Sequence, residues 1–310
     1  MNSKKVLFIK EPTTLKIVAF LCAVWFSASL GECGPRRIVS LYPGHTDNIA
    51  ALGGGERLVA VSGGDFSYLH PGTIRLPIRV GAEAVLALKP DVVFLRSLAV
   101  QLNPHLAGAL ERAGVTVHVI DPPSWDGFED YLTRLAEILG VNPAEARAKL
   151  QNLRGGIARE AEARSKGDSP RVFLETTSRE LRTCSPDSWA ARLIELAGGA
   201  NAARNAAPLR EGSPLAPWGV ERVLALAGEL DVYLVQQGPM NAATLDDVRS
   251  RPWFSALSVQ NVRLASIPES CLSRPSLLGL EEGGKILMEI FYGAPRGQVG
   301  FRSKGVLRLW

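Results

Sequence analysis

The sequence is poor in the residues that metal sites use. Its four histidines, His45, His70, His105 and His118, are scattered, and none lies at metal-ligand spacing from another. A protein that binds bare zinc or manganese needs several histidines and carboxylates that converge on the ion. The sequence therefore disfavours a bare-metal binding protein, which stays an alternative, and we expect no metal-ligating residues.

Familiar catalytic and nucleotide-binding signatures are also absent: there is no G-x-S-x-G, H-E-x-x-H, P-loop or G-x-G-x-x-G. The run Gly53-Gly54-Gly55 follows a predicted helix and precedes a predicted strand, the reverse of a nucleotide-binding turn, so we interpret it as a helix C-cap. We predict no enzyme activity and no cofactor. An exported α/β enzyme of unknown reaction remains an alternative, because serine, histidine and aspartate are all present.

Positive charge is missing from the body of the chain. The formal net charge is +4, but it comes from the lysines before residue 31 and from a basic tail, residues 295–310. The body between these ends is net acidic, whereas a nucleic-acid binder carries its positive charge on the folded domain. We therefore expect no nucleic-acid partner. The tail is interpreted as a disordered end, with a membrane-surface contact as the alternative.

Only one long hydrophobic run is present, the uncharged stretch 17–31. It is shorter than the about 20 apolar residues that a membrane span needs. Preceding lysines and the small residues Ser29 and Gly31 predict a signal peptide over residues 1–31, and hence a periplasmic or other extracytoplasmic protein. A retained membrane anchor is the alternative. Glu32 stands where lipidation of Cys33 would favour a small residue, so we do not favour a lipidated N-terminus.

Cysteine is scarce, and only Cys184 and Cys271 lie in the body of the chain. An exported protein is free to pair them, so a disulfide between them is possible. Free buried thiols and a thiolate contact to a bound metal are the alternatives.

Short apolar runs that read as buried strands alternate with helical patterns along the rest of the chain. The chain of 310 residues exceeds one usual compact core, so we predict an α/β fold with two lobes and mainly parallel sheets, residues 36–122 and 169–294. The predicted strands are 37–41, 57–62, 91–95, 115–120, 171–175, 231–236 and 261–267. The predicted helices are 46–52, 104–113, 188–197, 220–227 and 273–291.

Residues 123–168 show no strand pattern and are predicted to form a long helical connector, the backbone helix between the lobes. Asn142-Pro143 indicates a break, with Pro143 in the first turn of the second helical segment. Gly155-Gly156 disfavours an unbroken second segment. The alternative is a pair of ordinary surface helices within one domain.

A repeated pattern links the two lobes. In each, a predicted short helix begins with a glutamate, Glu83 or Glu221, packs Val and Leu inward and leads into a strand that begins with Asp. Taken singly, each glutamate is explained by the helix dipole. Their matched placement suggests a paired role.

Several segments together resemble the periplasmic solute-binding proteins of iron-chelate and cobalamin ABC importers. These are Arg37-Ile-Val-Ser-Leu-Tyr-Pro-Gly-His-Thr-Asp-Asn-Ile, Leu88-Lys-Pro-Asp-Val-Val and Leu193-Ile-Glu-Leu-Ala-Gly-Gly-Ala-Asn, and the resemblance covers residues 36–293. It implies a rigid backbone helix, a monomer and a membrane permease as partner. The glutamates that dock on the permease in that family match Glu83 and Glu221.

The resemblance implies a ligand cleft, which we expect beyond the carboxyl ends of the strands. The candidate residues are aromatic, amide-bearing or cationic: Tyr42, His45, Phe66, Tyr68, Arg96, Trp125, Arg182, Trp218, Gln236 and Arg274. Aromatic and amide groups suit a corrinoid, and arginines suit the carboxylates of a ferric siderophore or haem. We predict the substrate-binding component of an ABC importer for a metal chelate, with a corrinoid slightly favoured.

Overall fold

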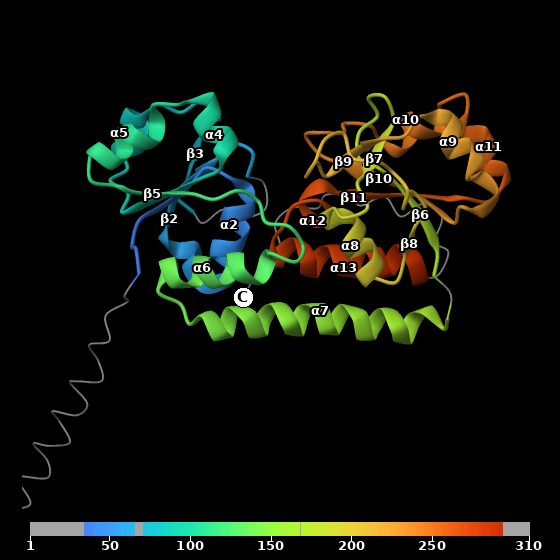
Figure 1. The fold of residues 1–310 in the computed structure, drawn as a ribbon, viewed down its shortest axis with the longest axis horizontal. Helices are drawn as coiled ribbons and strands as arrows, with labels where there is room; N and C mark the ends of the chain where they lie inside the picture. The colour runs from blue at the N-terminus through green and yellow to red at the C-terminus, as the bar shows by residue number, and fades with distance from the viewer. Residues whose placement is uncertain (1–33, 66–70, 168, 294–310) are drawn as a thin grey trace, which may run out of the picture. The chain divides into compact units, whose positions relative to one another are not determined.

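Two parallel sheets organise the computed structural model, which describes residues 34–65, 71–167 and 169–293 (Figure 1). The described residues from Pro35 onward belong to one compact unit. We call the part around the first sheet the N-lobe and the part around the second sheet the C-lobe. The predicted signal peptide, residues 1–31, and the predicted basic tail, residues 295–310, lie outside the described residues.

The N-lobe sheet has five strands in the order β3-β2-β1-β4-β5, and all neighbouring strands are parallel. Strands β2 and β3 therefore lie on one side of β1, and β4 and β5 lie on the other side. The strands are β1 (Ile38–Ser40), β2 (Leu58–Ser62), β3 (Ile74–Leu76), β4 (Val92–Leu95) and β5 (Thr116–Val119). Its helices are α2 (Pro43–Ile49), α3 (Ala82–Leu86), α4 (Ser97–Leu102) and α5 (Leu106–Arg112).

The C-lobe sheet has four parallel strands in the order β11-β10-β6-β8, beside a small antiparallel pair, β7 and β9. The strands are β6 (Arg171–Glu175), β7 (Arg182–Cys184), β8 (Ala200–Asn201), β9 (Leu215–Pro217), β10 (Val232–Gln237) and β11 (Arg263–Pro268). The helices are α8 (Trp189–Leu196), α9 (Val220–Ala225), α10 (Leu245–Arg249), α11 (Phe254–Val259), α12 (Glu269–Leu272) and α13 (Leu277–Tyr292).

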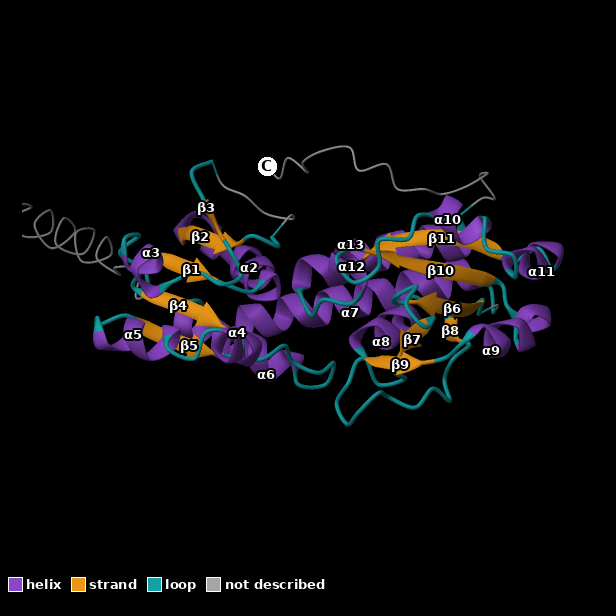
Figure 2. Cartoon of the chain, turned by 90° about the horizontal axis from the view of Figure 1, so that it is seen from above, coloured by secondary structure: helices purple, strands orange, loops and turns teal. Residues whose placement is uncertain are grey.

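Two consecutive helices connect the lobes, α6 (Phe128–Leu139) and the longer α7 (Pro143–Ser165). Asn142 accepts a hydrogen bond from the backbone N–H of Ala144, and Pro143 occupies the first turn of α7, as predicted. Figures 1 and 2 show α7 running alongside both lobes, where it contacts α6 and α13. The prediction of two α/β lobes joined by a long backbone helix is confirmed.

One apolar cluster passes through both lobes and the connector. It includes Phe94 of β4, Leu135 of α6, Leu150 of α7, Leu193 of α8 and Leu287 of α13, all of them buried. Each sheet has a further apolar cluster on its other face, one in the N-lobe and one in the C-lobe. Because each buried side chain of this size contributes about 1.5–3 kcal/mol, the shared cluster opposes separation of the lobes.

The seven predicted strands all form, with ends that shift by at most two residues. The sequence reading missed β3, β7, β8 and β9, which have only two or three residues each and lack an apolar run. It was also wrong about Gly155-Gly156, because α7 runs through this pair without a break. Gly53 has a φ of 84°, in the left-handed region, so the C-cap interpretation of the glycine run is confirmed.

The glycines of the connector and its partner helix give opposite predictions for stability. A methyl group at Gly156 of α7 would meet no atom within 4 Å, so Gly156→Ala should raise the free energy of unfolding by about 0.5–1 kcal/mol. A methyl group at Gly284 of α13 would lie 2.7 Å from Cδ1 of the buried Ile157. Gly284→Ala should therefore lower the free energy of unfolding by about 1–3 kcal/mol.

Urea denaturation at an unchanged m-value measures both effects. If Gly284→Ala were as stable as the wild type, the close packing of α13 on α7 would be incorrect.

Candidate ligand-binding cleft

The order of the strands defines where a ligand can bind. In each sheet the chain reverses its direction of growth, between β1 and β4 in the N-lobe and between β6 and β10 in the C-lobe. Open α/β sheets bind ligands outside the carboxyl ends of their strands at such points. Tyr42 and Arg96 follow β1 and β4, and Thr176 and Gln237 lie at the ends of β6 and β10.

Tyr42 and Arg96 come together at the switch point of the N-lobe. The guanidinium carbon of Arg96 lies 5.0 Å from the centre of the Tyr42 ring, a cation–π arrangement. Burial raises the pKa of Tyr42 to about 12, although the charges of Arg274 and Arg96 oppose the shift. The phenol therefore keeps its proton and can donate a hydrogen bond to a ligand.

Arg274 of the C-lobe reaches the same region. Its guanidinium lies 3.6 Å from Oδ2 of Asp47 on α2, and both side chains are buried. The charges of Arg274 and Arg96 both lower the pKa of Tyr42 against the effect of burial, so these three predicted residues, from both lobes, lie in one region. An aromatic ring beside two arginines can bind a ligand that carries both a flat apolar face and an anionic group.

The buried carboxyl group of Asp65 forms hydrogen bonds that hold α2 close to the end of β2. Oδ2 of Asp65, at the carboxyl end of β2, accepts hydrogen bonds from Ser62 N at 3.0 Å, Ser62 Oγ at 3.0 Å and Thr46 Oγ1 at 3.2 Å. Burial raises the pKa of Asp65 to about 6, against the hydrogen bonds from Ser62 and with the charge of Asp47. Asp65 thereby ties α2 to the loop that continues toward residue 66.

In the C-lobe a buried network organises the loops after β6 and β10. Glu175 accepts two hydrogen bonds from the guanidinium of Arg251, at 2.6 and 2.9 Å, one from the Tyr233 hydroxyl at 2.6 Å and one from Asn241 Nδ2 at 3.2 Å. Burial and the adjacent carboxylate raise the pKa of Tyr233 above its ordinary value. Because all partners of Glu175 come from the C-lobe, the network fixes the shape of that lobe's loops.

His45 belongs to the core and not to the cleft. Its side chain is 0% exposed, and its two ring nitrogens lie 2.9 Å from Ile120 O and 2.9 Å from Tyr131 Oη. A carbonyl can only accept, so Nε2–H donates to Ile120 and Nδ1 accepts from Tyr131. No ring nitrogen is left for a ligand, and the assignment of His45 to the binding set is wrong in this structure.

Two other predicted binding residues, Trp218 and Gln236, are buried, and a third, Trp125, is packed between neighbouring side chains. Trp218 belongs to the apolar cluster of the C-lobe, under the guanidinium of Arg222 at 3.5 Å from its ring centre. Gln236 is 0% exposed and accepts a hydrogen bond from Ser273 Oγ. Trp125 is partly exposed but packs between Trp189, at 4.7 Å, and Arg154, at 4.2 Å.

The remaining predicted residues divide into three groups. Arg182 is partly exposed on β7 and pairs with Glu180 at 2.6 Å. Phe66 and Tyr68 lie outside the described residues. Cys184 and Cys271 are free thiols, so the possible disulfide is not formed in this structure.

The two glutamates of the repeated pattern occupy equivalent positions. Glu83 and Glu221 are exposed in the first turns of α3 and α9, and a glycine precedes the first turn of each helix. Neither forms an ion pair with a described residue within 4 Å. Both carboxylates are therefore available to a partner protein, and their docking role stays a prediction.

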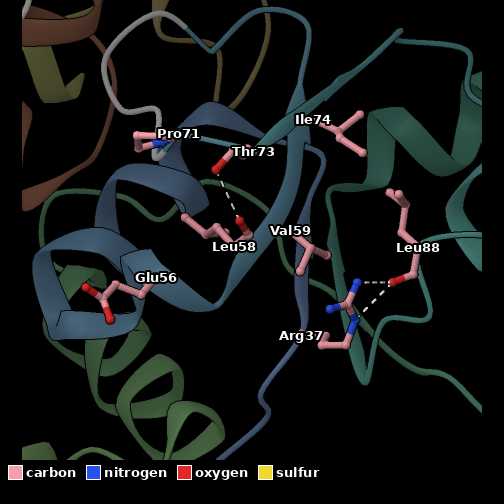
Figure 3. Close-up of a pocket in the computed structure, with 9 residues that line it drawn as sticks. Arg37, Glu56, Leu58, Val59, Pro71, Thr73, Ile74 and Leu88 are labelled. Carbon is pink, nitrogen blue, oxygen red and sulfur yellow. Dashed lines mark hydrogen bonds between the residues drawn. The ribbon is translucent and has the colours of Figure 1, made fainter.

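Two surface pockets lie at the amino ends of the strands, away from the carboxyl ends where a ligand is expected. One, of about 300 Å³, is bounded by residues at the amino ends of β1, β2 and β3. In Figure 3 the Arg37 guanidinium of this pocket points to the Leu88 carbonyl, and Thr73 donates to Leu58 O. The other, of about 580 Å³, includes Asp231 and Arg263 at the amino ends of β10 and β11. Their location does not fit the rule for ligands of parallel sheets.

Within the described parts of the chain, no three His, Cys, Asp or Glu side chains gather where they could hold a metal ion. Nor does any helix in those parts combine the length and apolar character that crossing a bilayer requires.

Sequence comparison identifies the family. Residues 38–270 match the family described as "Periplasmic binding protein". The chain belongs to the periplasmic binding protein family. Members of this family are solute-binding proteins and not enzymes, which confirms the prediction that the chain is not an enzyme, and membership supports an extracytoplasmic location.

Two curated relatives have names that describe a role. The chain is 26% identical over 180 residues to an uncharacterized ABC transporter substrate-binding lipoprotein of Bacillus subtilis, a match that spans 54% of this chain and 56% of that protein. It is 25% identical over 256 residues to the vitamin B12-binding protein of Vibrio cholerae, with 78% and 84% of the two chains covered.

The fold resembles that of a solved periplasmic binding protein. A possible iron-binding protein from Staphylococcus epidermidis superposes with a TM-score of 0.64 at 19% identity, over 81% of this chain and 98% of that chain. At this level of identity the likeness concerns the fold alone.

Sequence reading missed several buried polar residues of this periplasmic binding protein. The most informative are the buried Asn48 and Asp65 in the N-lobe, and in the C-lobe the buried Glu175 with its partly buried partner Arg251. Glu175 is the last residue of β6 and Asp65 lies three residues after β2, so their position at the end of an apolar run was a usable signal. Arg251 and Asn48 gave none, because their partners are distant in sequence.

The burial of His45 predicts a specific pH dependence of stability. Burial lowers the pKa of His45 to about 4, against an ordinary 6.5. Between these pH values the unfolded chain binds the proton and the folded chain does not, so the free energy of unfolding falls as the pH falls from 6.5 toward 4. The raised pKa of Asp65 makes the free energy of unfolding rise as the pH falls over part of this window. The contribution of His45 is therefore measured as the difference between a His45 variant and the wild type.

Replacement of His45 by Gln should remove this loss, which amounts to roughly 3 kcal/mol over the window. Urea denaturation at several pH values measures it, and His105→Gln, at an exposed histidine, should keep the wild-type slope. Equal slopes for His45→Gln and the wild type would contradict the assignment of a buried neutral imidazole.

Proposed function

We propose that this periplasmic binding protein captures a metal chelate in the cleft between its lobes and delivers it to the permease of an ABC importer. Family membership supports a binding role, and the names of the two curated relatives support an importer and a chelate ligand. The observation that carries the proposal is the group formed by Tyr42, Arg96 and Arg274 at the carboxyl edges of the sheets.

The chemistry of this group favours a chelate over a small sugar or a bare ion. Arg96 and Arg274 offer planar donors for carboxylate or phosphate, and Tyr42 offers an apolar face with one polar atom. The described residues that surround the group provide no cluster of metal ligands, so the metal is expected to arrive already coordinated.

Within the chelates we propose a corrinoid as the first candidate. The support is the relative from Vibrio cholerae, a vitamin B12-binding protein matched over 84% of its length. The amide argument from the sequence has become weaker, because the carbonyl of the buried Gln236 is engaged by Ser273. The two arginines suit the carboxylates of haem or a ferric siderophore equally well, which makes these the alternatives to test.

Docking on the permease is assigned to Glu83 and Glu221. Exposed ion pairs contribute little affinity each, but two carboxylates at a fixed spacing orient one protein on another. The extracytoplasmic location supports this proposal, since the permease presents its docking surface on that side.

A ligand panel tests the proposal. We expect that cyanocobalamin, haemin or a ferric siderophore quenches the tryptophan fluorescence of residues 34–293 with a dissociation constant of about 1 μM or less. Arg96→Gln should weaken binding roughly ten- to hundredfold, since a hydrogen bond to a charged group contributes about 1.5–3 kcal/mol. Arg112→Gln, an exposed arginine on α5, is the control and should bind normally. Binding of none of the three, or turnover of one of them, would refute the proposal.

Charge reversal tests docking. Glu83→Lys and Glu221→Lys should abolish uptake of the bound chelate in cells that carry the permease, and should leave the affinity for the chelate unchanged. Glu111→Lys and Glu211→Lys, which reverse exposed carboxylates elsewhere in each lobe, should transport normally. If the docking variants lost affinity and uptake in parallel, Glu83 and Glu221 would be structural residues.

A further inference from the structure

A buried side chain amide, that of Asn48 on α2, connects the two lobes directly. Its Oδ1 accepts a hydrogen bond from the backbone N–H of Leu277 at 2.9 Å, and its Nδ2 donates to the carbonyl of Pro275 at 3.1 Å. The other Nδ2 hydrogen is directed to Gly44 O within α2 at 2.8 Å. Asn48 is 0% exposed, so these bonds do not compete with bulk water.

The pairing requires an amide in this place. Leu277 begins α13, and the first N–H groups of a helix have no partner within the helix. Pro275, two residues earlier, presents a carbonyl that needs a donor. Only a side chain with an acceptor and a donor on one planar group satisfies both, and an unpaired buried group would be destabilising.

The residue before Asn48 holds the same segment. Asp47 lies 3.6 Å from the guanidinium of Arg274, which immediately precedes Pro275. Successive residues of α2 thus bind successive residues of the C-lobe, through one ion pair and one amide. Figures 1 and 2 both show α2 beside the end of α13 where this segment lies, and the two helices are in contact.

Asn48 is itself held from the N-lobe side. The Tyr131 hydroxyl lies 3.5 Å from Nδ2, and Tyr131 in turn donates to His45. Because the amide cannot rotate without breaking several buried bonds, it transmits the position of α2 to the C-lobe with little freedom.

We propose that Asn48 is a positioning residue that fixes the mutual orientation of the lobes. Together with the Asp47–Arg274 pair, it links the lobes directly, in addition to the connector α6–α7 and the shared apolar cluster. In doing so it holds Arg274 at the cleft and keeps the helices of Glu83 and Glu221 at one spacing. The consequences for ligand and permease rest on the proposed function, whereas the orientation of the lobes does not.

A distance measurement between the lobes tests the proposal without a ligand. Spin labels are placed at Ala87→Cys and Ala225→Cys, exposed positions four residues after Glu83 and Glu221, in a background with Cys22→Ser, Cys33→Ser and Cys271→Ser. Cys184 is buried and stays in place. Double electron–electron resonance then gives the distribution of the distance between α3 and α9.

The test variant is Asn48→Ala, and the matched control is Asn201→Ala. Asn201 is also a buried asparagine, but its carbonyl oxygen accepts from Ala203 N within the C-lobe and does not contact the N-lobe. We expect Asn48→Ala to broaden the distance distribution about twofold, and Asn201→Ala to leave its width unchanged, since only Asn48 belongs to the interlobe network. Equal widths for Asn48→Ala and the wild type, or equal broadening in both variants, would overturn the proposal.

If Asn48→Ala does not fold, Asn48→Asp decides the question. The carboxylate keeps an acceptor for Leu277 N–H but cannot donate to Pro275 O, so the distribution should be broader than that of the wild type. An unchanged width for this variant would equally overturn the proposal.

The chelate found by fluorescence supplies a separate readout. Its affinity should fall about tenfold in Asn48→Ala and stay unchanged in Asn201→Ala. If no chelate binds the wild type, the proposed function fails, but the distance measurement still decides the role of Asn48. A broadened distribution with unchanged affinity would overturn the claim that Asn48 holds Arg274 for the ligand.

Discussion

The placement of the two sheets relative to each other depends on an apolar cluster that belongs to both lobes. Leu135 of α6, Leu150 of α7 and Leu287 of α13 are all buried in it, together with Phe94 from the N-lobe sheet. Lobes that moved apart would expose this surface to water, at a cost proportional to the apolar area. The carboxyl edges of the two sheets are therefore held in place by apolar packing, and a ligand that bound between them, as we propose, would have less entropy to overcome.

The polar side chains near the proposed site are paired with one another, and this pairing determines which hydrogen-bond donors remain for a ligand. Asp47 and Arg274 are buried together, and a buried charge is tolerated only when it is paired. The pair fixes Arg274 in place but also occupies part of its hydrogen-bonding capacity. Arg96, stacked on Tyr42 and only partly buried, is therefore the more available of the two arginines for an anionic group.

The sequence predicted the fold well because the buried strands are continuous apolar runs. The sequence did not predict β3, β7 and β9. Each has three residues without an apolar run, and each is a strand only because its backbone pairs with a neighbouring strand. For the site, the rule that ligands lie beyond carboxyl ends located Tyr42 and Arg96 correctly on one edge. The rule names the edge but not the direction of a side chain, so His45, Trp218 and Gln236 were assigned to the cleft although they face the core. The link made by Asn48 could not be predicted, since its partners in the C-lobe lie more than 220 residues away.

A crystal structure with the bound chelate is the most direct test of the cleft. We expect the ligand to lie between the carboxyl edges of the two sheets, in contact with Tyr42, Arg96 and Arg274. A chelate bound at the amino ends of β1, β2 and β3, in the pocket between Arg37 and Thr73, would contradict this expectation.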